Sequence, residues 1–166
     1  MLGTSEALVK ASLQRARASL GQRRRATERE CGPSQASPAE RTLVRRFADA
    51  FGADDIDGVV RLLTDDAWLA MPPAPREYHG RVAISAFLSA SATWRNGRRF
   101  HLVPAGANTQ PAFGCYLSDK TGETRPAGLI VLTLEGDQIG AITRFLDAGV
   151  FDQFRLPPTL GAYQQA

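Results

Sequence analysis

The sequence predicts an α+β fold in which three helices pack on a strongly curved antiparallel sheet, with a separate basic helix in front of them. Between residues 38 and 88, apolar side chains recur every three or four residues behind clear helix-start signals, which is the period of amphipathic helices. From Arg98 onward the period changes to two, which is the period of strands that are half-buried in a sheet. The turns between these later segments are short and polar, as in an antiparallel meander.

The start of the chain carries most of the positive charge. Residues 1–31 hold seven Lys and Arg against three Glu, a formal charge of +4, whereas the other 135 residues hold thirteen basic and fourteen acidic groups, or −1. A narrow apolar stripe at helical spacing runs along this segment: Val9, Leu13, Ala16 and Leu20. Such a helix suits a polyanion or an acidic protein surface. A charge run alone is more typical of a solvated helix, so both interpretations stay open.

Composition narrows the class of protein. No apolar run approaches the roughly 20 residues that cross a bilayer, and the N-terminus has no signal-peptide core, so we expect a cytoplasmic protein that does not engage a membrane. Cys31 and Cys115 are far apart and fit neither a disulfide framework nor a metal site. The sequence also shows no metal-ligand constellation and no phosphate-cradling Gly loop, so we expect no metal and no organic cofactor.

The first helix of the main domain has a strong start signal. A linker, residues 31–37, ends with Ser37 as N-cap, Pro38 at the first helical position and Glu40 three residues after the cap. Apolar side chains then follow at a four-residue spacing until Gly52: Leu43, Phe47 and Phe51. This pattern predicts an amphipathic helix with one buried face.

Two more helices and a short strand follow. Asp54 or Asp55 is placed to cap a second helix, whose inward residues are expected to be Ile56, Val59, Val60 and Leu63. Residues 67–71 read as a short strand that ends at a proline-rich turn. A third helix begins after Gly80, with an expected buried side formed by Val82, Ala83, Ala86, Phe87 and Leu88.

Four strands complete the predicted sheet. They are residues 98–109, 112–118, 124–135 and 138–147. The stretch LIVLTL is apolar on both faces, so we expect a central strand with helices covering one of its sides. A short closing segment and a tail, residues 157–166, end the chain.

Residues 38–156 resemble the SnoaL-like branch of the NTF2-like superfamily, an α+β cone that includes polyketide cyclases and ketosteroid isomerases. The resemblance is carried by LVRRFADAFGADDIDGVVRLLTDDAWLAMPP, YHGRVAISAFL and LIVLTLEGDQIGAITRFLD. It implies a pocket between the helices and the concave face of the sheet. It does not imply one activity, since the fold hosts enzymes, binders and scaffolds.

The opening stretch MLGTSEALVKASLQRARASL resembles the end of region 4 of extracytoplasmic-function (ECF) sigma factors, the recognition half of a helix-turn-helix. We assign residues 1–30 to this partial motif. A subset of these factors carries a SnoaL-like domain after a short linker, in the order found here. The resemblance implies DNA contacts, to bases from the first three of the following residues and to phosphates from the rest: Ser5, Glu6, Lys10, Gln14, Arg15 and Arg17.

Together the two resemblances imply the C-terminal portion of an ECF-type RNA polymerase sigma factor, with a SnoaL-like domain as a fused regulatory module. RNA polymerase core and promoter DNA would then be the partners of the full-length protein. A small-molecule ligand in the pocket and a homodimer are further expectations. We expect the pocket to be lined by aromatic and polar side chains: Trp68, Met71, Tyr78, Trp94, His101, Phe113, Tyr116, Phe145 and Asp147.

Two alternatives stay open. One is a stand-alone enzyme of the cyclase or isomerase type, in which His101 or Asp147 abstracts a proton next to a carbonyl and Tyr116 stabilises the enolate. The other is a dimeric ligand-binding module without chemistry. We favour a non-enzymatic role, because each candidate side chain also has an ordinary structural explanation and a lone His on a strand is usually hydrogen-bonded at a rim.

Overall fold

The computed structural model describes residues 37–107, 110–119, 123–147 and 149–160. The chain divides into two units, residues 1–35 and 36–166, and every described residue belongs to the second. The predicted basic helix therefore lies outside the described residues. The same is true of the six residues predicted to contact DNA: Ser5, Glu6, Lys10, Gln14, Arg15 and Arg17.

The first described helix, α2 (Pro38–Gly52), begins at the predicted capping box. The Ser37 N–H donates to Oε2 of Glu40 at 2.6 Å, and the Glu40 N–H donates to Oγ of Ser37 at 3.1 Å. These two bonds satisfy donors that the helix itself leaves free. The buried side of α2 has the predicted four-residue spacing: Leu43, Phe47 and Phe51.

Two further helices follow as predicted, α3 (Ile56–Arg61) and α4 (Gly80–Arg95). Of the two candidate caps for α3, Asp55 is the N-cap; its side chain accepts from the Gly58 N–H at 2.8 Å. The predicted buried side of α4 is wrong in part, because Val82 is 86% exposed. The stripe that faces the core is instead centred on Ile84 and Leu88. None of the described helices is long and apolar enough to cross a membrane.

Six strands of the described chain form one mixed sheet in the order β2-β1-β6-β5-β4-β3. Their bounds are β1 (Leu63–Ala70), β2 (Glu77–His79), β3 (Phe100–Ala107), β4 (Gln110–Ser118), β5 (Thr124–Glu135) and β6 (Gln138–Phe145). The prediction of an antiparallel sheet is corrected at one position, where β1 pairs parallel with β6. Two features were not predicted: strand β2, which is too short to show a period, and the early start of β1, whose first residue, Leu63, the sequence pattern assigns to the preceding helix and whose next three residues it indicates as a break before the strand.

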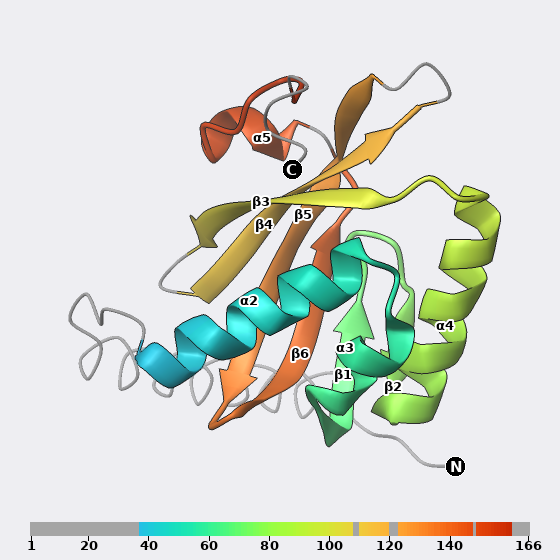
Figure 1. Ribbon diagram of the computed structural model, residues 1–166, viewed down its shortest axis with the longest axis vertical. Helices are drawn as coiled ribbons and strands as arrows, with labels where there is room; N and C mark the ends of the chain where they lie inside the picture. The colour runs from blue at the N-terminus through green and yellow to red at the C-terminus, as the bar shows by residue number, and fades with distance from the viewer. Residues whose placement is uncertain (1–36, 108–109, 120–122, 148, 161–166) are drawn as a thin grey trace, which may run out of the picture. The chain divides into compact units, whose positions relative to one another are not determined.

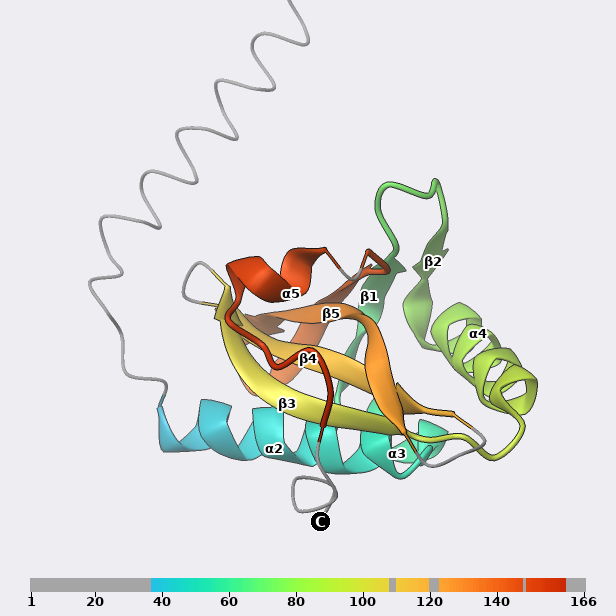
Figure 2. The ribbon, with the colours of Figure 1, turned by 90° about the horizontal axis from the view of Figure 1, so that it is seen from above.

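The sheet is covered on both faces. Figure 1 shows α2 lying across the strands and α4 along one side of the sheet, and Figure 2 shows α2 and the short helix α5 (Val150–Gln153) on opposite sides. The inner core, under α2, α3 and α4, includes Phe47, Val59, Leu69, Ile84, Phe113, Ile130 and Ile142. The outer core, under α5, is smaller: Tyr116, Leu129, Phe151, Leu156 and Leu160. Central strand β5 contributes to both, as its two apolar faces predicted.

A bulge between β4 and β5 bends the sheet. The register of this pair shifts between Cys115 and Tyr116, opposite Gly128. Gly128 has φ +114°, a conformation that residues with a side chain rarely adopt. A Cβ at this position would lie 2.1 Å from the carbonyl oxygen of Phe145 on β6. Glycine is therefore required both by the backbone conformation and by the closeness of the neighbouring strand.

We expect Gly128→Ala to lower the free energy of unfolding by about 3 kcal/mol, since it adds backbone strain to a clash with β6. The matched control is Gly106→Ala on β3, where a Cβ meets nothing within 4 Å. Urea unfolding followed by far-UV circular dichroism measures both. Equal stability of the two variants would contradict the assigned role of Gly128.

Candidate functional site

A cavity of about 570 Å³ lies between α4 and one end of the sheet. Four of its lining residues come from α4, two from the segment between β1 and β2, one from each of β3, β4, β5 and β6, and one from just after β6. They are Met71, Arg76, Phe87, Ser91, Trp94, Arg95, Phe100, Leu117, Ala127, Arg144 and Leu146. The volume falls in the range of small-molecule sites, roughly 300–1,000 Å³.

Apolar side chains make up most of the wall. Met71 and Phe100 are buried, and Phe87 is held from behind by Tyr78, whose ring centroid lies 4.3 Å away. Trp94 and Leu146 also line the cavity, yet they are 76% and 52% exposed. Two large apolar side chains that face solvent next to a cavity offer area that a ligand can cover.

Arg95 lines this cavity, and its side chain is held in place by contacts within the protein. Its guanidinium forms an ion pair with Asp54, and it donates to Oγ of Ser91 at 2.9 Å and to the carbonyl oxygen of Arg98 at 3.2 Å. Its side chain is only 5% exposed. These contacts tie the end of α4 to the connection between α2 and α3. The charge of Arg95 is thus neutralised within the protein.

Arg144 has no such partner. It lies on β6 opposite Ile130, with its side chain on the inner face two residues after the buried Ile142. Its Nε is enclosed and makes no hydrogen bond, and no ion pair to Arg144 exists within the described part of the chain. Burial lowers the pKa of Arg144 from its ordinary value; Cys115 opposes this shift, and the charge of Arg95 adds to it to a smaller extent. The guanidinium is therefore held as a partly desolvated, unneutralised charge.

The contacts of Arg144 are aromatic rather than ionic. Its guanidinium carbon lies 4.6 Å from the centroid of the Phe100 ring, and that of Arg95 lies 4.5 Å from the same centroid. A cation–π contact contributes about 0.5–2 kcal/mol, which offsets only part of the cost of desolvating a cation. The Phe100 ring thus contacts two guanidinium groups, and of these only Arg95 is neutralised by an ion pair within the described residues.

Comparison with known proteins identifies the domain that holds this cavity. Residues 44–140, more than half of the chain, match the SnoaL-like domain family. The chain belongs to the SnoaL-like family. Solved structures agree on the fold: an NTF2-like protein of unknown function from Mesorhizobium loti (TM-score 0.56, 22% identity, 70% of this chain and 97% of that one) and a putative isomerase of the SnoaL-like family from Agrobacterium tumefaciens (TM-score 0.52, 20% identity, 67% and 99%). The predicted fold class is confirmed.

The chain is also similar to longer proteins. It is 35% identical over 161 residues to the ECF RNA polymerase sigma factor SigG of Mycobacterium tuberculosis, in strains CDC 1551 / Oshkosh and H37Rv. The match covers 96% of this chain and 42% of each relative, so the chain spans less than half the length of the curated relatives it matches. Since 96% is covered, the similarity extends through most of the segment in front of the SnoaL-like domain.

The nine residues predicted to share one pocket are divided between several places. Met71 and Trp94 line the large cavity, whereas Phe113 is part of the inner core and does not line it. Tyr116 and Phe145 belong to the outer face of the SnoaL-like domain, under α5. Phe145 lines a separate cavity of about 330 Å³ there.

The other four lie around these two cavities. Tyr78 packs behind the wall of the large cavity, and Trp68, which is 40% exposed, stacks on the ring of His79 with centroids 6.1 Å apart. His101 lies on the outer face, and Asp147 lies in the turn after β6. Alternation along a strand had indicated which residues share a face, but not which face is the concave one.

The three residues of the enzymatic alternative do not converge. His101 and Tyr116 are direct cross-strand neighbours, but Nε2 of His101 is 3.0 Å from Oγ of Ser118, and the Tyr116 hydroxyl donates to the Pro157 carbonyl at 2.6 Å. Burial raises the pKa of Tyr116 to about 12. Asp147 follows β6, three strand spacings from β3, or about 14 Å. Its carboxylate accepts from a backbone N–H two residues on, at 2.8 Å.

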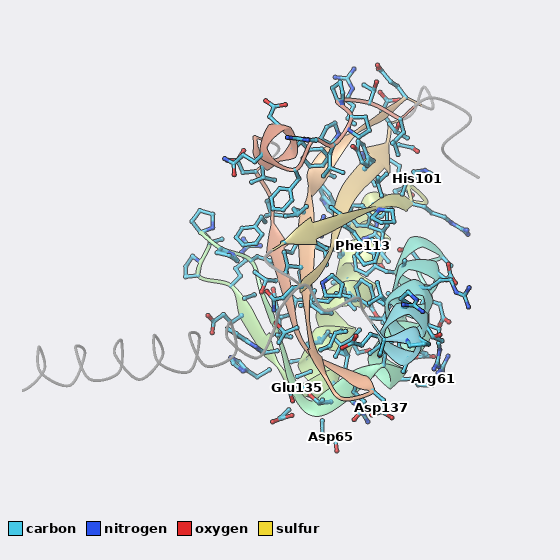
Figure 3. The ribbon with its side chains drawn as sticks, turned by 90° about the vertical axis from the view of Figure 1, so that its left-hand side faces the viewer. Arg61, Asp65, His101, Phe113, Glu135 and Asp137 are labelled. Atoms are coloured by element: carbon cyan, nitrogen blue, oxygen red, sulfur yellow. The ribbon has the colours of Figure 1, made fainter. Side chains whose placement is uncertain are left out.

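Three of the described acidic residues lie away from His101. Figure 3 shows Asp65, Glu135 and Asp137 at one end of the SnoaL-like domain, with Phe113 and His101 towards the other. No group of three or more His, Cys, Asp or Glu side chains in the described ranges is arranged to hold a metal ion. The large cavity itself is lined by aromatic, aliphatic and cationic side chains.

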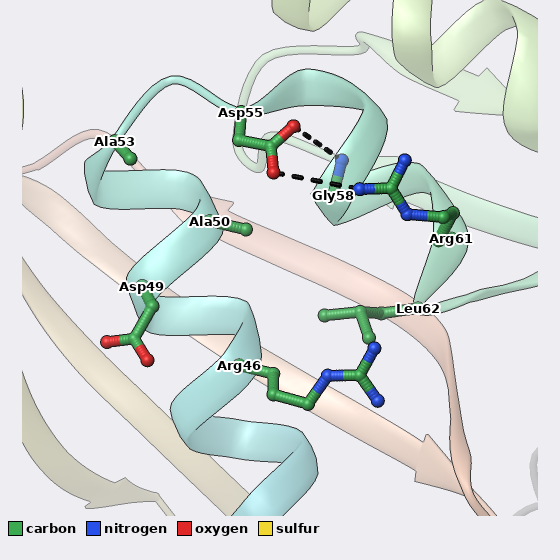
Figure 4. A pocket seen from close by; sticks show the side chains of 8 residues that line it. All are labelled: Arg46, Asp49, Ala50, Ala53, Asp55, Gly58, Arg61 and Leu62. Atoms are coloured by element: carbon green, nitrogen blue, oxygen red, sulfur yellow. Dashed lines mark hydrogen bonds and ion pairs between the residues drawn. The ribbon is translucent and has the colours of Figure 1, made fainter.

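A second hollow, between α2 and α3, has a different character (Figure 4). Its volume is about 330 Å³, and two arginines and two aspartates line it. Asp55 accepts from the Gly58 N–H and lies 3.7 Å from Arg61, so its charge already has partners in the protein. The formal charges of its lining side chains balance, two arginines against two aspartates, whereas no acidic side chain is among the described residues that line the larger cavity.

Arg144 was absent from the sequence-based list, although the sequence contains a signal for it. In the strand pattern of residues 138–147, Ile142, Arg144 and Leu146 point to one face. A charged residue in an otherwise apolar, inward-facing series is unusual, because burying an unpaired charge costs free energy. Such a position is a candidate for function.

We expect Arg144→Met to raise the free energy of unfolding of the ligand-free chain by about 1 kcal/mol, because it removes a poorly compensated charge at similar side-chain volume. Arg45→Met, at an exposed position of α2, is the matched control and should change stability by less than about 0.5 kcal/mol. Urea denaturation at pH 7 measures both variants. A loss of stability in Arg144→Met would show that the guanidinium has a structural role.

Proposed function

We propose that this chain is the C-terminal portion of an ECF-type RNA polymerase sigma factor and that its SnoaL-like domain is a fused regulatory module. The observation that carries the proposal is the 35% identity to SigG over 96% of the chain, which includes most of the segment before the domain. That segment resembles the recognition helix of region 4. The order of recognition helix, linker and SnoaL-like domain supports the same assignment.

In this proposal, the opening segment contacts promoter DNA. Its charge of +4 favours the phosphate backbone, and the domain that follows has no comparable excess. Base contacts come from Ser5, Glu6 and Lys10, and phosphate contacts from Gln14, Arg15 and Arg17. The complete protein would supply the remaining regions that bind RNA polymerase core, which places its action in the cytoplasm.

The SnoaL-like domain regulates by favouring one arrangement of the sigma regions over another. A small ligand in the 570 Å³ cavity can shift that balance only if it binds one arrangement more tightly. Such a mechanism needs a binding cavity and no catalytic group. Pairing of two domains into a homodimer is a further regulatory contact in this proposal.

The proposal predicts that the native protein is longer than this chain. An antibody to the SnoaL-like domain should capture, from the source cells, a protein whose intact mass is well above 18.0 kDa. A native mass of 18.0 kDa would contradict the sigma factor assignment.

In the full-length protein, Arg15→Ala should weaken promoter binding at every sequence tested and reduce the salt dependence of the affinity by about one unit of slope. Arg45→Ala, on the exposed face of α2, removes the same charge outside the DNA-binding segment and should leave both unchanged. Run-off transcription with core polymerase and fluorescence anisotropy measure the two effects. Identical behaviour of the two variants would contradict the predicted DNA contact.

A further inference from the structure

The large cavity has an unbalanced charge. Three of its lining residues are arginines, and none of the described lining residues is acidic. Arg95 is neutralised by Asp54, whereas no ion pair in the described part of the chain reaches Arg144 or Arg76. Arg76 is exposed at the rim, and Arg144 lies deeper, with its Nε enclosed. The cavity thus presents one neutralised and two unneutralised guanidinium groups.

This arrangement is unfavourable in the empty domain and favourable with an anion bound. A guanidinium presents a planar fork of N–H donors that matches a carboxylate in a two-point contact. Low water content in a cavity strengthens such a contact. An anion bound to Arg144 would offset the cost of desolvating its guanidinium, the same desolvation that lowers its pKa. The charge of the anion would itself be paired with the guanidinium, so the complex would contain no unpaired buried charge from the ligand.

The rest of the cavity wall restricts the kind of molecule to which the negative charge can belong. Beyond the arginines, the lining is formed mainly by aromatic and aliphatic side chains, from Phe87, Phe100, Met71, Leu117 and Leu146. A polyphosphate needs several enclosed cations or a cradle of backbone N–H groups, whereas only one enclosed arginine is unneutralised here. A single negative charge joined to an apolar body matches the charge and the lining together.

We propose that this cavity binds a small carboxylic acid with an aromatic or aliphatic body, and that the carboxylate pairs with Arg144. The body would lie against Phe87 and Leu117, with Trp94 covering it at the mouth and Arg76 attracting the anion at the rim. The inference rests on the proposed regulatory function, for which it names the ligand class. The bound acid would join α4, β6 and the β1–β2 segment, three elements that otherwise meet at a void.

The test uses the 166-residue chain and a pair of probes that differ only in charge, 4-phenylbutyrate and 4-phenylbutanamide. The chain has two tryptophans, so Trp68→Phe leaves Trp94 as the sole indole reporter. Titration followed by Trp94 fluorescence, and by calorimetry on the unsubstituted chain, gives both affinities. The carboxylate should bind at least about ten-fold more tightly than the amide and should raise the melting temperature. Octanoate against octanamide repeats the comparison with an aliphatic body.

Arg144→Met should remove this preference, weakening the carboxylates at least about ten-fold and leaving the amides unchanged. Arg144→Lys keeps the charge without the fork and should fall between the two. Arg45→Met removes a surface charge of the same kind and should bind like the unsubstituted chain. Melting curves of each variant establish that it is folded, and Arg144→Lys carries the comparison if Arg144→Met does not fold.

Three results would overturn the inference: equal affinity for acid and amide, undiminished carboxylate binding by Arg144→Met, or no binding of either acid at about 10 mM. The experiments distinguish a failure of the ligand proposal from a failure of the sigma factor assignment. Absence of binding together with promoter recognition that depends on Arg15 would reject the ligand site and keep the sigma factor assignment. Binding at Arg144 with transcription unaffected by the acid would keep the site and reject its regulatory role.

Discussion

The buried guanidinium of Arg95 connects the helical layer of this domain to its sheet. It sits at the C-terminal end of α4, pairs with Asp54 in the connection between α2 and α3, and lies over the ring of Phe100 at the start of β3. A group this enclosed is stable only when its donors are satisfied, and Arg95 also donates to Ser91 and to a backbone carbonyl. The ion pair therefore fixes where α4 ends, and with it one wall of the cavity.

Arg144, the second guanidinium that contacts the Phe100 ring, has no partner for its charge in the described part of the chain. Arg144 approaches Phe100 almost as closely as Arg95 does, yet its enclosed Nε has no acceptor. The difference is positional: Arg95 is within reach of a loop that presents a carboxylate, whereas Arg144 extends from β6, an interior strand of the sheet, into a cavity with no acidic side chain among its described lining residues. Buried polar groups without partners are uncommon in folded proteins, and they concentrate where a ligand completes them. Within one cavity, the donors of Arg95 are satisfied by the protein itself, whereas the Nε of Arg144 is left without an acceptor among the described residues.

Closure of the cone depends on the sheet as well as on the helices. The bulge at Gly128 bends β5 where it crosses between β4 and β6, and the outer face of the bent sheet is covered by α5 and the segment after it. Tyr116 and Thr124 are held to that segment by hydrogen bonds to Pro157 and Leu160. The outer face is thus occupied by the protein's own chain, and the inner face keeps the large cavity. Because of this division, two aromatic residues of β4 lie in different cores, Phe113 in the inner core and Tyr116 in the outer core.

The sequence by itself determined the elements whose signals are local. The capping box at Ser37, the four-residue stripe of α2 and the two-residue period of the last four strands each involve residues that are close together in the chain, and all of them appear in the structure. Only the tertiary structure decided the parallel pairing of β1 with β6 and the ion pair between Asp54 and Arg95, 41 residues apart. It also decided which strand face looks into the cavity, and hence that Arg144 and not His101 lies there. Contacts of this kind form between segments that only folding brings together, so no local period encodes them.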